Sequence, residues 1–243
     1  MTTDINCIQK TNFELELTIL MPCLNEEKTV LNCIKQAKEF INRNNLKAEI
    51  LIADNGSCDN SVKIAKEAGA RVVNVPQKGY GCALRGGIKE AQGKYIIMGD
   101  CDESYDFLNL EEFLSHLRAG ASLVMGDRFS GGFEDGAMPF SHRYIGVPFL
   151  SWLGRIAFKT NVRDFHSGLR AICRKDFENI EFTSTGMEFA TEMVAKAATN
   201  NMKIAQVPIC LKRDGRNGAK SHLRTVRDGF RHVMYILKNI SKN

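Results

Sequence analysis

The alternation of apolar and polar residues divides the first half of the chain into strands and helices. Short, nearly continuous apolar runs predict buried strands, and apolar residues that recur every three or four positions predict helices. The predicted strands are residues 17–21, 48–53, 71–75, 94–98 and 122–125, and the predicted helices are residues 30–41, 59–68, 79–91 and 109–118. Pro22 should end the first strand, and Asn25 should cap the helix that follows. This alternation indicates an α/β fold with a mostly parallel sheet and helices on both faces.

The second half of the chain is less regular and ends in an amphipathic segment. We expect a flexible loop at 131–139, helices at 145–158, 186–199 and 222–240, and strands at 169–173 and 203–208. The last helix has an apolar stripe (Leu223, Val226, Phe230, Val233, Met234, Leu237, Ile240) and a basic stripe (Arg224, Arg227, Arg231, Lys238). Such a helix can lie in the headgroup region of a membrane. Docking on the protein's own core, or a dimer contact, would satisfy the same pattern.

Composition and charge narrow the class of protein. The 243 residues are 44% hydrophobic and 25% charged, as in ordinary globular proteins, and no apolar run approaches the length of a membrane span. Residues 212–243 contain nine Lys or Arg and two Asp, a net +7, so the other 211 residues carry −2 of the total +5. A charge confined to the tail favours a local anionic contact over a nucleic-acid groove. The first residues show no secretion signal, and the eight cysteines form no CxxC pair, which favours reduced thiols over structural zinc.

Four polar clusters follow predicted strands, and they point to a site. These clusters are residues 22–26, 54–57, 100–102 and 126–128. In parallel sheets the carboxyl ends of the strands meet at one edge, and ligands bind there. We therefore expect the four clusters to converge.

The pair Asp100 and Asp102 is the strongest chemical signal in the chain. The apolar run 94–98 delivers them to a strand end, and alternate side chains of an extended segment share a face. Two carboxylates at the mouth of a sheet suit Mg²⁺ or Mn²⁺ carrying a diphosphate. The Cys101 side chain should point the other way, as a buried thiol.

The ordered set of motifs resembles a known family. PCLNEE (22–27), DNGS (54–57), KGYG (78–81) and DCD (100–102) are similar, in order and spacing, to family 2 glycosyltransferases with the GT-A fold. GDRF (126–129), DFHSGLR (164–170) and TGMEF (185–189) resemble the polyprenyl-phosphate sugar transferases, of which dolichol-phosphate mannosyltransferase is the best known. The resemblance runs from about residue 17 to residue 235. It implies a transferase domain at 17–221, between an N-terminal extension (1–16) and a C-terminal amphipathic helix (222–243).

The resemblance also implies roles for individual residues. The donor nucleotide sugar would contact Pro22, Leu24, Glu26, Ile52, Asp54, Lys78, Asp100, Cys101, Asp102, Arg213, Arg216 and Lys220. For Asp54, an Asx turn with Gly56 is the structural alternative. Asp100, Asp102 and Ser104 would be the ligands of Mg²⁺ or Mn²⁺. Relatives often have Gln at the position of Ser104, and a hydroxyl is a weaker ligand.

The same resemblance assigns the acceptor side of the reaction. Arg128 and Arg143 would hold the lipid phosphate, and the segment 213–220 would close over the donor, with a solvated surface charge as the alternative for each. Asp102, Arg128 and Glu188 would be the catalytic residues. Asp164 and its neighbours could equally form a turn before the next strand. No general base is assigned, because the second pKa of a phosphate monoester is about 6 and the acceptor is already ionised.

These inferences predict a metal-dependent, inverting transferase. It would move a sugar from a nucleotide-diphosphate sugar to dolichyl or undecaprenyl phosphate, on the cytoplasmic face of a membrane. We expect it to bind the membrane peripherally or through a membrane partner protein, with no nucleic-acid partner and with a homo-oligomer possible. The alternatives are a transferase for a soluble or glycan acceptor and a non-catalytic nucleotide-sugar-binding subunit of a membrane complex.

Overall fold

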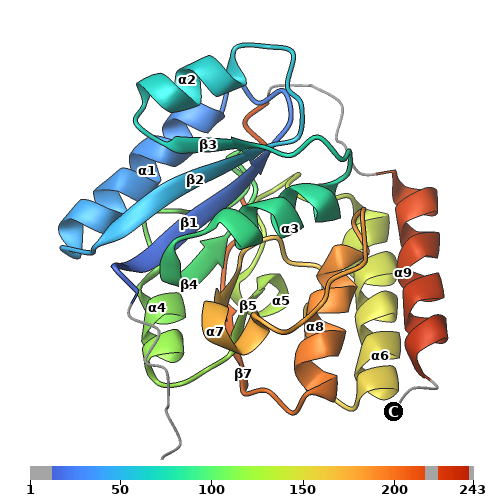
Figure 1. Ribbon diagram of the computed structural model, residues 1–243. Coiled ribbons are helices and arrows are strands. Elements are labelled where there is room, and N and C mark those ends of the chain that lie inside the picture. The colour runs from blue at the N-terminus through green and yellow to red at the C-terminus, as the bar shows by residue number, and fades with distance from the viewer. Residues whose placement is uncertain (1–12, 217–223, 241–243) are drawn as a thin grey trace, which may run out of the picture.

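The computed structural model describes residues 13–216 and 224–240, which form a seven-stranded sheet with helices on both faces (Figure 1). The strand order is β3-β2-β1-β4-β6-β5-β7. Every strand of this sheet runs in the same direction except β6, which is antiparallel to β4 and β5. The strands are β1 (Leu15–Cys23), β2 (Ala48–Asp54), β3 (Arg71–Asn74), β4 (Gly93–Met98), β5 (Leu123–Asp127), β6 (Arg170–Cys173) and β7 (Ile204–Pro208). The predicted mixed, mostly parallel sheet is confirmed.

Different helices cover the two faces of the sheet. Alternate strand residues reach opposite faces, so Ile19 packs into one core cluster and its neighbour Leu20 packs into the other. The first layer contains α1 (Val30–Arg43), α2 (Ser61–Glu67) and α4 (Glu111–Arg118). The second contains α3 (Tyr80–Glu90), α6 (Val147–Phe158), α7 (Arg174–Phe177), α8 (Phe189–Thr199) and α9 (Thr225–Asn239). Short α5 (Arg128–Gly131) and the π-helix η1 (His142–Gly146) lie between β5 and α6 along the chain.

The direction of the strands decides which loops meet. β1 and β2 end in register, with Cys23 opposite Asp54, and β4 ends near them at Met98. Because β6 runs the opposite way, it begins at the edge where the parallel strands end. The segment 164–169, which leads into β6, therefore reaches the same edge as the Asp100–Asp102 loop.

Two local predictions at the end of β1 are wrong. Pro22 does not end the strand, since it pairs with Ala53 and β1 continues to Cys23. The pairing of β1 with β4 stops at Leu20. Proline has no N–H to donate to a neighbouring strand, but no β4 residue pairs with Pro22, so the strand can continue through it. Asn25 does not cap α1. It adopts a left-handed conformation (φ 57°), and its side-chain oxygen accepts a hydrogen bond from the Cys58 N–H (2.8 Å).

The outer surface of α6 and α9 is apolar, and these helices pack side by side (Figure 1). We call this surface the α6–α9 face. It consists of the exposed side chains Phe140, Tyr144, Ile145, Phe149, Trp152, Ile156, Val226, Phe230, Leu237 and Ile240. Elsewhere in the described ranges, Leu31 is the one other large hydrophobic residue that is exposed. None of the described helices combines the length and the apolar character that a membrane crossing requires.

Candidate active site

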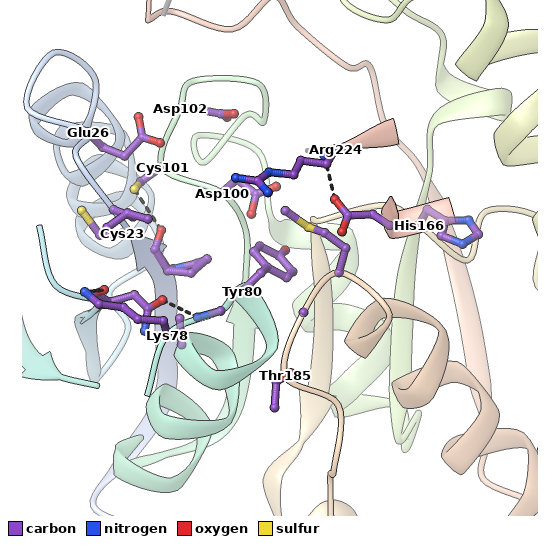
Figure 2. A pocket seen from close by; sticks show the side chains of 18 of the residues that line it. Cys23, Glu26, Lys78, Tyr80, Asp100, Cys101, Asp102, His166, Thr185 and Arg224 are labelled. Carbon is purple, nitrogen blue, oxygen red and sulfur yellow. Dashed lines mark hydrogen bonds between the residues drawn. The ribbon is translucent and has the colours of Figure 1, made fainter. Parts of the chain in front are cut away.

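A cavity of about 610 Å³ opens at the carboxyl ends of β1, β2 and β4 (Figure 2). Its walls come from the loops that follow β1, β2 and β4, from the segment 164–169, from the loop before α8 and from the start of α9. The lining includes Pro22, Leu24, Glu26, Lys78, Asp100, Cys101, Asp102, Arg128 and Arg216. The convergence that the sequence predicts for its strand-end clusters is therefore confirmed, with Asn55 rather than Asp54 representing the second of them.

Asp100 and Asp102 both line this cavity, just beyond β4. Burial and the nearby charge of Asp102 raise the pKa of Asp100 to about 6, although Tyr80 and Arg170 partly offset this effect. Gly168 packs directly against the Asp100 carboxylate, where a Cβ would collide with Oδ2. Two carboxylates that repel each other in a cavity wall form an electrostatically unfavourable pair that a cation would relieve.

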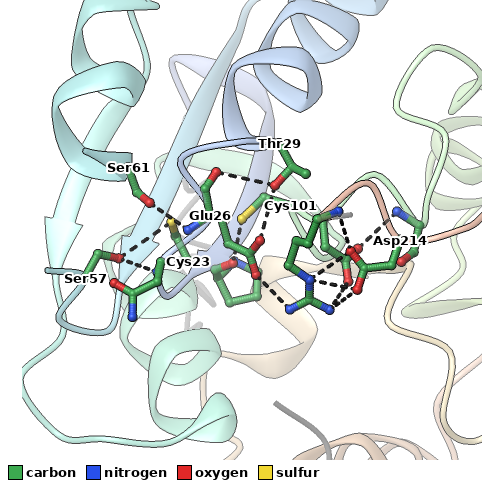
Figure 3. Close-up of polar contacts among 12 residues, drawn as sticks. Cys23, Glu26, Thr29, Ser57, Ser61, Cys101 and Asp214 are labelled. Atoms are coloured by element: carbon green, nitrogen blue, oxygen red, sulfur yellow. Dashed lines mark hydrogen bonds and ion pairs between the residues drawn. The ribbon is translucent and has the colours of Figure 1, made fainter. Parts of the chain in front are cut away.

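Arg216 is surrounded by three carboxylates (Figure 3). Its Nη1 lies 3.2 Å from Glu26 Oε1, and its Nη2 lies 3.2 Å from Asp102 Oδ2 and contacts Asp214. Burial opposes the charge on Arg216, but its hydrogen bonds to Asp214 and the charges of Glu26 and Asp102 leave its pKa raised. Burial also raises the pKa of Glu26 to about 7, against the lowering effect of Arg216. Arg216 thus offsets part of the negative charge on the acidic side of the cavity.

Arg128 lines the cavity but is engaged elsewhere. Its Nε and Nη2 contact the two oxygens of Asp164 at 2.6 and 2.8 Å, and both side chains are almost completely buried. Asp164 also accepts a hydrogen bond from the His166 N–H (3.1 Å). The turn expected before β6 is therefore present, and it is tied to Arg128. A bidentate buried pair leaves Arg128 little capacity for an incoming phosphate.

Glu188 and Arg143, two further predicted site residues, are outside the cavity lining. Glu188 Oε1 accepts from the Gly186 N–H (3.1 Å) and from Arg231 of α9 (2.6 Å). It therefore fastens α9 to the loop before α8. The Arg143 guanidinium stacks over the rings of Phe133 (4.5 Å) and Tyr144 (5.2 Å).

The other predicted donor contacts fall into three groups. Ile52 is completely buried in the core, and Asp54 accepts from the Gly56 and Ser57 N–H groups, which is the Asx turn given as the alternative to donor binding; neither residue lines the cavity. Arg213 contacts Glu134 and Asp135, and Ser104 gives its N–H to Asp102 (3.0 Å), so neither side chain lines the cavity. Lys220 lies outside the described residues.

Cys101 and Lys78 line the cavity, and the side chain of each donates to a backbone carbonyl. The Cys101 thiol is buried and donates to the Pro22 carbonyl (3.1 Å), as expected of a buried thiol. Lys78 Nζ donates to the carbonyl of Asn55 (2.7 Å). The Asn55 side chain in turn accepts from the Gly79 N–H (2.8 Å). These contacts fix the loop that leads into α3.

Sequence reasoning missed several residues of the cavity wall. The structure adds Asn55, Tyr80, Tyr105, His166, Arg224, Arg227, Asp228 and Arg231. Asn55, Tyr80 and His166 belong to quoted motifs, so their position in the sequence could have indicated them. The α9 residues gave another signal, a basic stripe, which we interpreted as facing a membrane.

His166 of the cavity wall contacts His232 of α9. The rings of His166 and His232 meet edge to face at 4.5 Å, and His232 Nδ1 lies 2.7 Å from the Thr191 hydroxyl. Burial lowers the pKa of His232 to about 4, and burial together with His232 lowers that of His166 well below its usual range. Both lowered pKa values favour the neutral imidazole, and the ring contact joins α9 to the segment before β6.

Comparison with known proteins gives a consistent result. Residues 18–181 match the family described as glycosyl transferase family 2. The chain is 37% identical over 225 residues to the low-salt glycan biosynthesis hexosyltransferase Agl6 of Haloferax volcanii, covering 92% of this chain and 53% of that protein. It is 30% identical to the dolichyl-phosphate hexose transferase of the same organism, covering 80% of this chain and 82% of that protein. The chain thus spans about half the length of Agl6 and most of the second relative.

Solved structures share the fold. Glucosyl-3-phosphoglycerate synthase from Mycobacterium tuberculosis, in complex with Mn²⁺, uridine diphosphate and glucosyl-3-phosphoglycerate, superposes with a TM-score of 0.72 at 21% identity. That alignment covers 94% of this chain and 81% of the synthase. A crystal structure of a mycobacterial protein gives a TM-score of 0.75 at 20% identity, covering 94% of this chain and 75% of the other. The predicted fold class is confirmed.

Proposed function

Because the chain belongs to glycosyl transferase family 2, we propose that it moves a hexose from a nucleotide-diphosphate sugar to a polyprenyl phosphate at the surface of a membrane. The observation that carries this proposal is the joint position of α9. One side of α9 lines the cavity that contains Asp100 and Asp102, and its other side belongs to the exposed α6–α9 face. A lipid lying along that face would have its phosphate near the cavity. The dolichyl-phosphate hexose transferase relative supports the same acceptor class.

The acidic side of the cavity fits a donor and its metal. Asp100 and Asp102 face the same space, and in the described part of the chain no three His, Cys, Asp or Glu side chains gather as a complete metal site. This is the donor set that suits Mg²⁺ or Mn²⁺, which bind through one or two carboxylates and complete their shell with substrate phosphates and water. When bound, the ion would neutralise the leaving diphosphate. The structural neighbour with Mn²⁺ and uridine diphosphate supports this use of the fold.

This chain's residues then account for the remaining steps. Glu26, Leu24 and Asn55 would hold the base and ribose, and Arg216, shared among three carboxylates, would reduce the negative charge that the diphosphate meets beside Asp102. An ionised acceptor phosphate would attack the anomeric carbon from the side opposite the departing diphosphate, which inverts the configuration. No side chain has to remove a proton from such an acceptor.

The α6–α9 face fits an anionic membrane surface. Residues 136–163 contain no Asp or Glu and carry Arg143, Arg155, Lys159 and Arg163. Asp228, the one acidic residue of 224–240, is buried. Aromatic and aliphatic side chains with a basic surround and no exposed carboxylate are typical of helices that lie in the headgroup region. We therefore propose peripheral attachment on the cytoplasmic face.

Two assays test this function. Purified protein, Mg²⁺ or Mn²⁺, a panel of labelled nucleotide-diphosphate hexoses and polyprenyl phosphate in vesicles should give a labelled lipid. In flotation with vesicles of phosphatidylcholine and phosphatidylglycerol, the variant F149S/W152S/F230S should lose binding, whereas L31S, which removes the exposed leucine on α1, should float like the unchanged protein. Transfer to soluble acceptors only, by a protein that ignores these vesicles, would contradict the proposal and favour a soluble acceptor. Donor binding without any turnover would favour a binding subunit.

A further inference from the structure

The first turns of α9 present charged side chains to the cavity at helical spacing. Arg224, Arg227, Asp228 and Arg231 all line it, at positions i, i+3, i+4 and i+7. Residues at this spacing share one face of a helix. The neighbours Val226 and Phe230 are exposed, 86% and 63%, on the α6–α9 face. The start of α9 therefore separates a basic inner side from an apolar outer side.

Two of these three arginines have no acidic partner among the described residues. Arg231 is committed, because it donates to Glu188 and to the Thr185 hydroxyl. Asp228 is buried, and its carboxylate accepts the backbone N–H of Arg224 (2.7 Å). Arg224 and Arg227 line the cavity, both are exposed, and in the described ranges neither has a carboxylate within ion-pair distance. They are available to an incoming anion.

The position of Arg224 separates it from the donor side. In Figure 2, Glu26, Cys23 and Lys78 lie on one side of Asp100, and Arg224 lies on the other and points toward Asp100. Arg216 forms ion pairs with Glu26 and Asp102 on the donor side of the cavity. An anion at Arg224, with Arg227 three residues further along α9 and also in the cavity lining, would thus face the proposed metal-bound diphosphate across the cavity, where an attacking acceptor would lie.

We propose that Arg224 and Arg227 form the subsite for the phosphate monoester of the acceptor. The inference rests on the proposed transferase function and replaces Arg128 and Arg143 in that role. Arg128 is held by Asp164, and Arg143 stacks on aromatic rings outside the cavity lining. Guanidinium forks match the oxygens of a phosphate dianion. With Val226 and Phe230 on the opposite side of the same turns, the helix can place a phosphate inside the cavity and its hydrocarbon chain outside.

The test compares two double variants that remove equal charge. R224Q/R227Q removes the proposed subsite. K63Q/K66Q removes two exposed lysines at the same i, i+3 spacing on α2, in the other helix layer. The acceptor is presented in vesicles of pure phosphatidylcholine, so that lost charge does not weaken attraction to an anionic surface. Three quantities are measured: KM for polyprenyl phosphate, Kd for the donor with Mn²⁺, and Kd for a short water-soluble isoprenyl phosphate by calorimetry.

The expected result is selective loss on the acceptor side. Hydrogen bonds to charged groups contribute enough for KM and the isoprenyl phosphate Kd to rise about tenfold or more in R224Q/R227Q, with donor Kd and thermal midpoint unchanged. K63Q/K66Q should match the unchanged protein in every measurement. A loss for the lipid in vesicles together with unchanged affinity for the soluble phosphate would show that the arginines contact the bilayer instead and would overturn the inference.

Two further outcomes keep this inference separate from the proposed function. If donor affinity falls as much as acceptor affinity, Arg224 and Arg227 bind the donor diphosphate, and the inference fails while the transferase function stands. If the unchanged protein makes no lipid product, the proposed acceptor fails. The calorimetric comparison then still decides whether the two arginines bind a phosphate monoester, since it requires no turnover. R224K/R227K, which keeps the charge, should restore part of the lost affinity.

Discussion

The Arg128–Asp164 pair gives the clearest prediction, because the sequence assigned Arg128 to substrate and the structure assigns it to Asp164. The side chains are 7% and 0% exposed, and two hydrogen bonds of 2.6 and 2.8 Å join them. Removing one partner leaves the other as an uncompensated buried charge, which costs about 3–5 kcal/mol. We therefore expect R128A to destabilise the protein by this amount, with a fall in Tm of about 6–20 °C for a chain of this length.

The assay is urea unfolding of four proteins at neutral pH: the unchanged chain, R128A, D164A and R128M/D164L. The two single variants should lose similar amounts of unfolding free energy, and the double variant should lose less than either, since it leaves no unpaired charge. If R128A loses less than about 1 kcal/mol, the value typical of an exposed pair, and KM for the acceptor phosphate rises sharply, Arg128 is a free phosphate ligand and the structural reasoning is wrong.

Three further predictions concern α9 and the metal site. The pKa of His232 is lowered to about 4 from an ordinary 6.5, so the unfolded chain takes up its proton first as the pH falls; this one group lowers the unfolding free energy by about 2 kcal/mol between pH 7.5 and pH 5, so the difference in unfolding free energy between the unchanged chain and H232Q, measured by urea unfolding, should change by about that amount between the two pH values. D102A should lower product formation by about a hundredfold or more and abolish the gain in donor affinity that Mn²⁺ gives, because a metal ligand is lost; unchanged Mn²⁺-dependent binding in calorimetry would refute this. G168A would bring a Cβ into the Asp100 carboxylate and to 2.9 Å from Tyr105 Cε2, so its donor affinity with Mn²⁺ should fall while its affinity without metal changes little; equal losses in both would show a general distortion.

What could be predicted from the sequence is what backbone topology fixes. The apolar runs determine the strands, and parallel strands bring their carboxyl ends to one edge, so the meeting of Pro22, Glu26 and Asp100 follows from residue order. The antiparallel β6 was not predictable in this way, because a four-residue apolar segment gives no direction. Its direction is nevertheless what brings Gly168 against Asp100. The role of that glycine became visible only with the sheet order.

The partners of the arginines could not be predicted, for a different physical reason. A guanidinium sits at the end of a long, flexible side chain, and within its reach an acidic side chain competes with any substrate phosphate. Arg128 and Arg216 are both predicted site residues and both line the cavity, yet one is paired with Asp164 and the other is shared among three carboxylates. Residue type and strand-end position indicate that positive charge belongs here, but only the full set of neighbours shows which arginine remains available.

Helix α9 shows why it matters for function that the partners of arginines cannot be predicted from the sequence. A basic and an apolar stripe on one helix favour a membrane contact in which both stripes meet lipid, and that interpretation treats the arginines as equivalent. In the fold, the ion pair of Arg231 with Glu188 and the buried His232 fix the rotation of α9 about its axis. That rotation turns Arg224 and Arg227 into the cavity and leaves Val226 and Phe230 outside. The same two stripes therefore suit two parts of one molecule, a phosphate and its hydrocarbon chain, which is the chemistry of a polyprenyl phosphate.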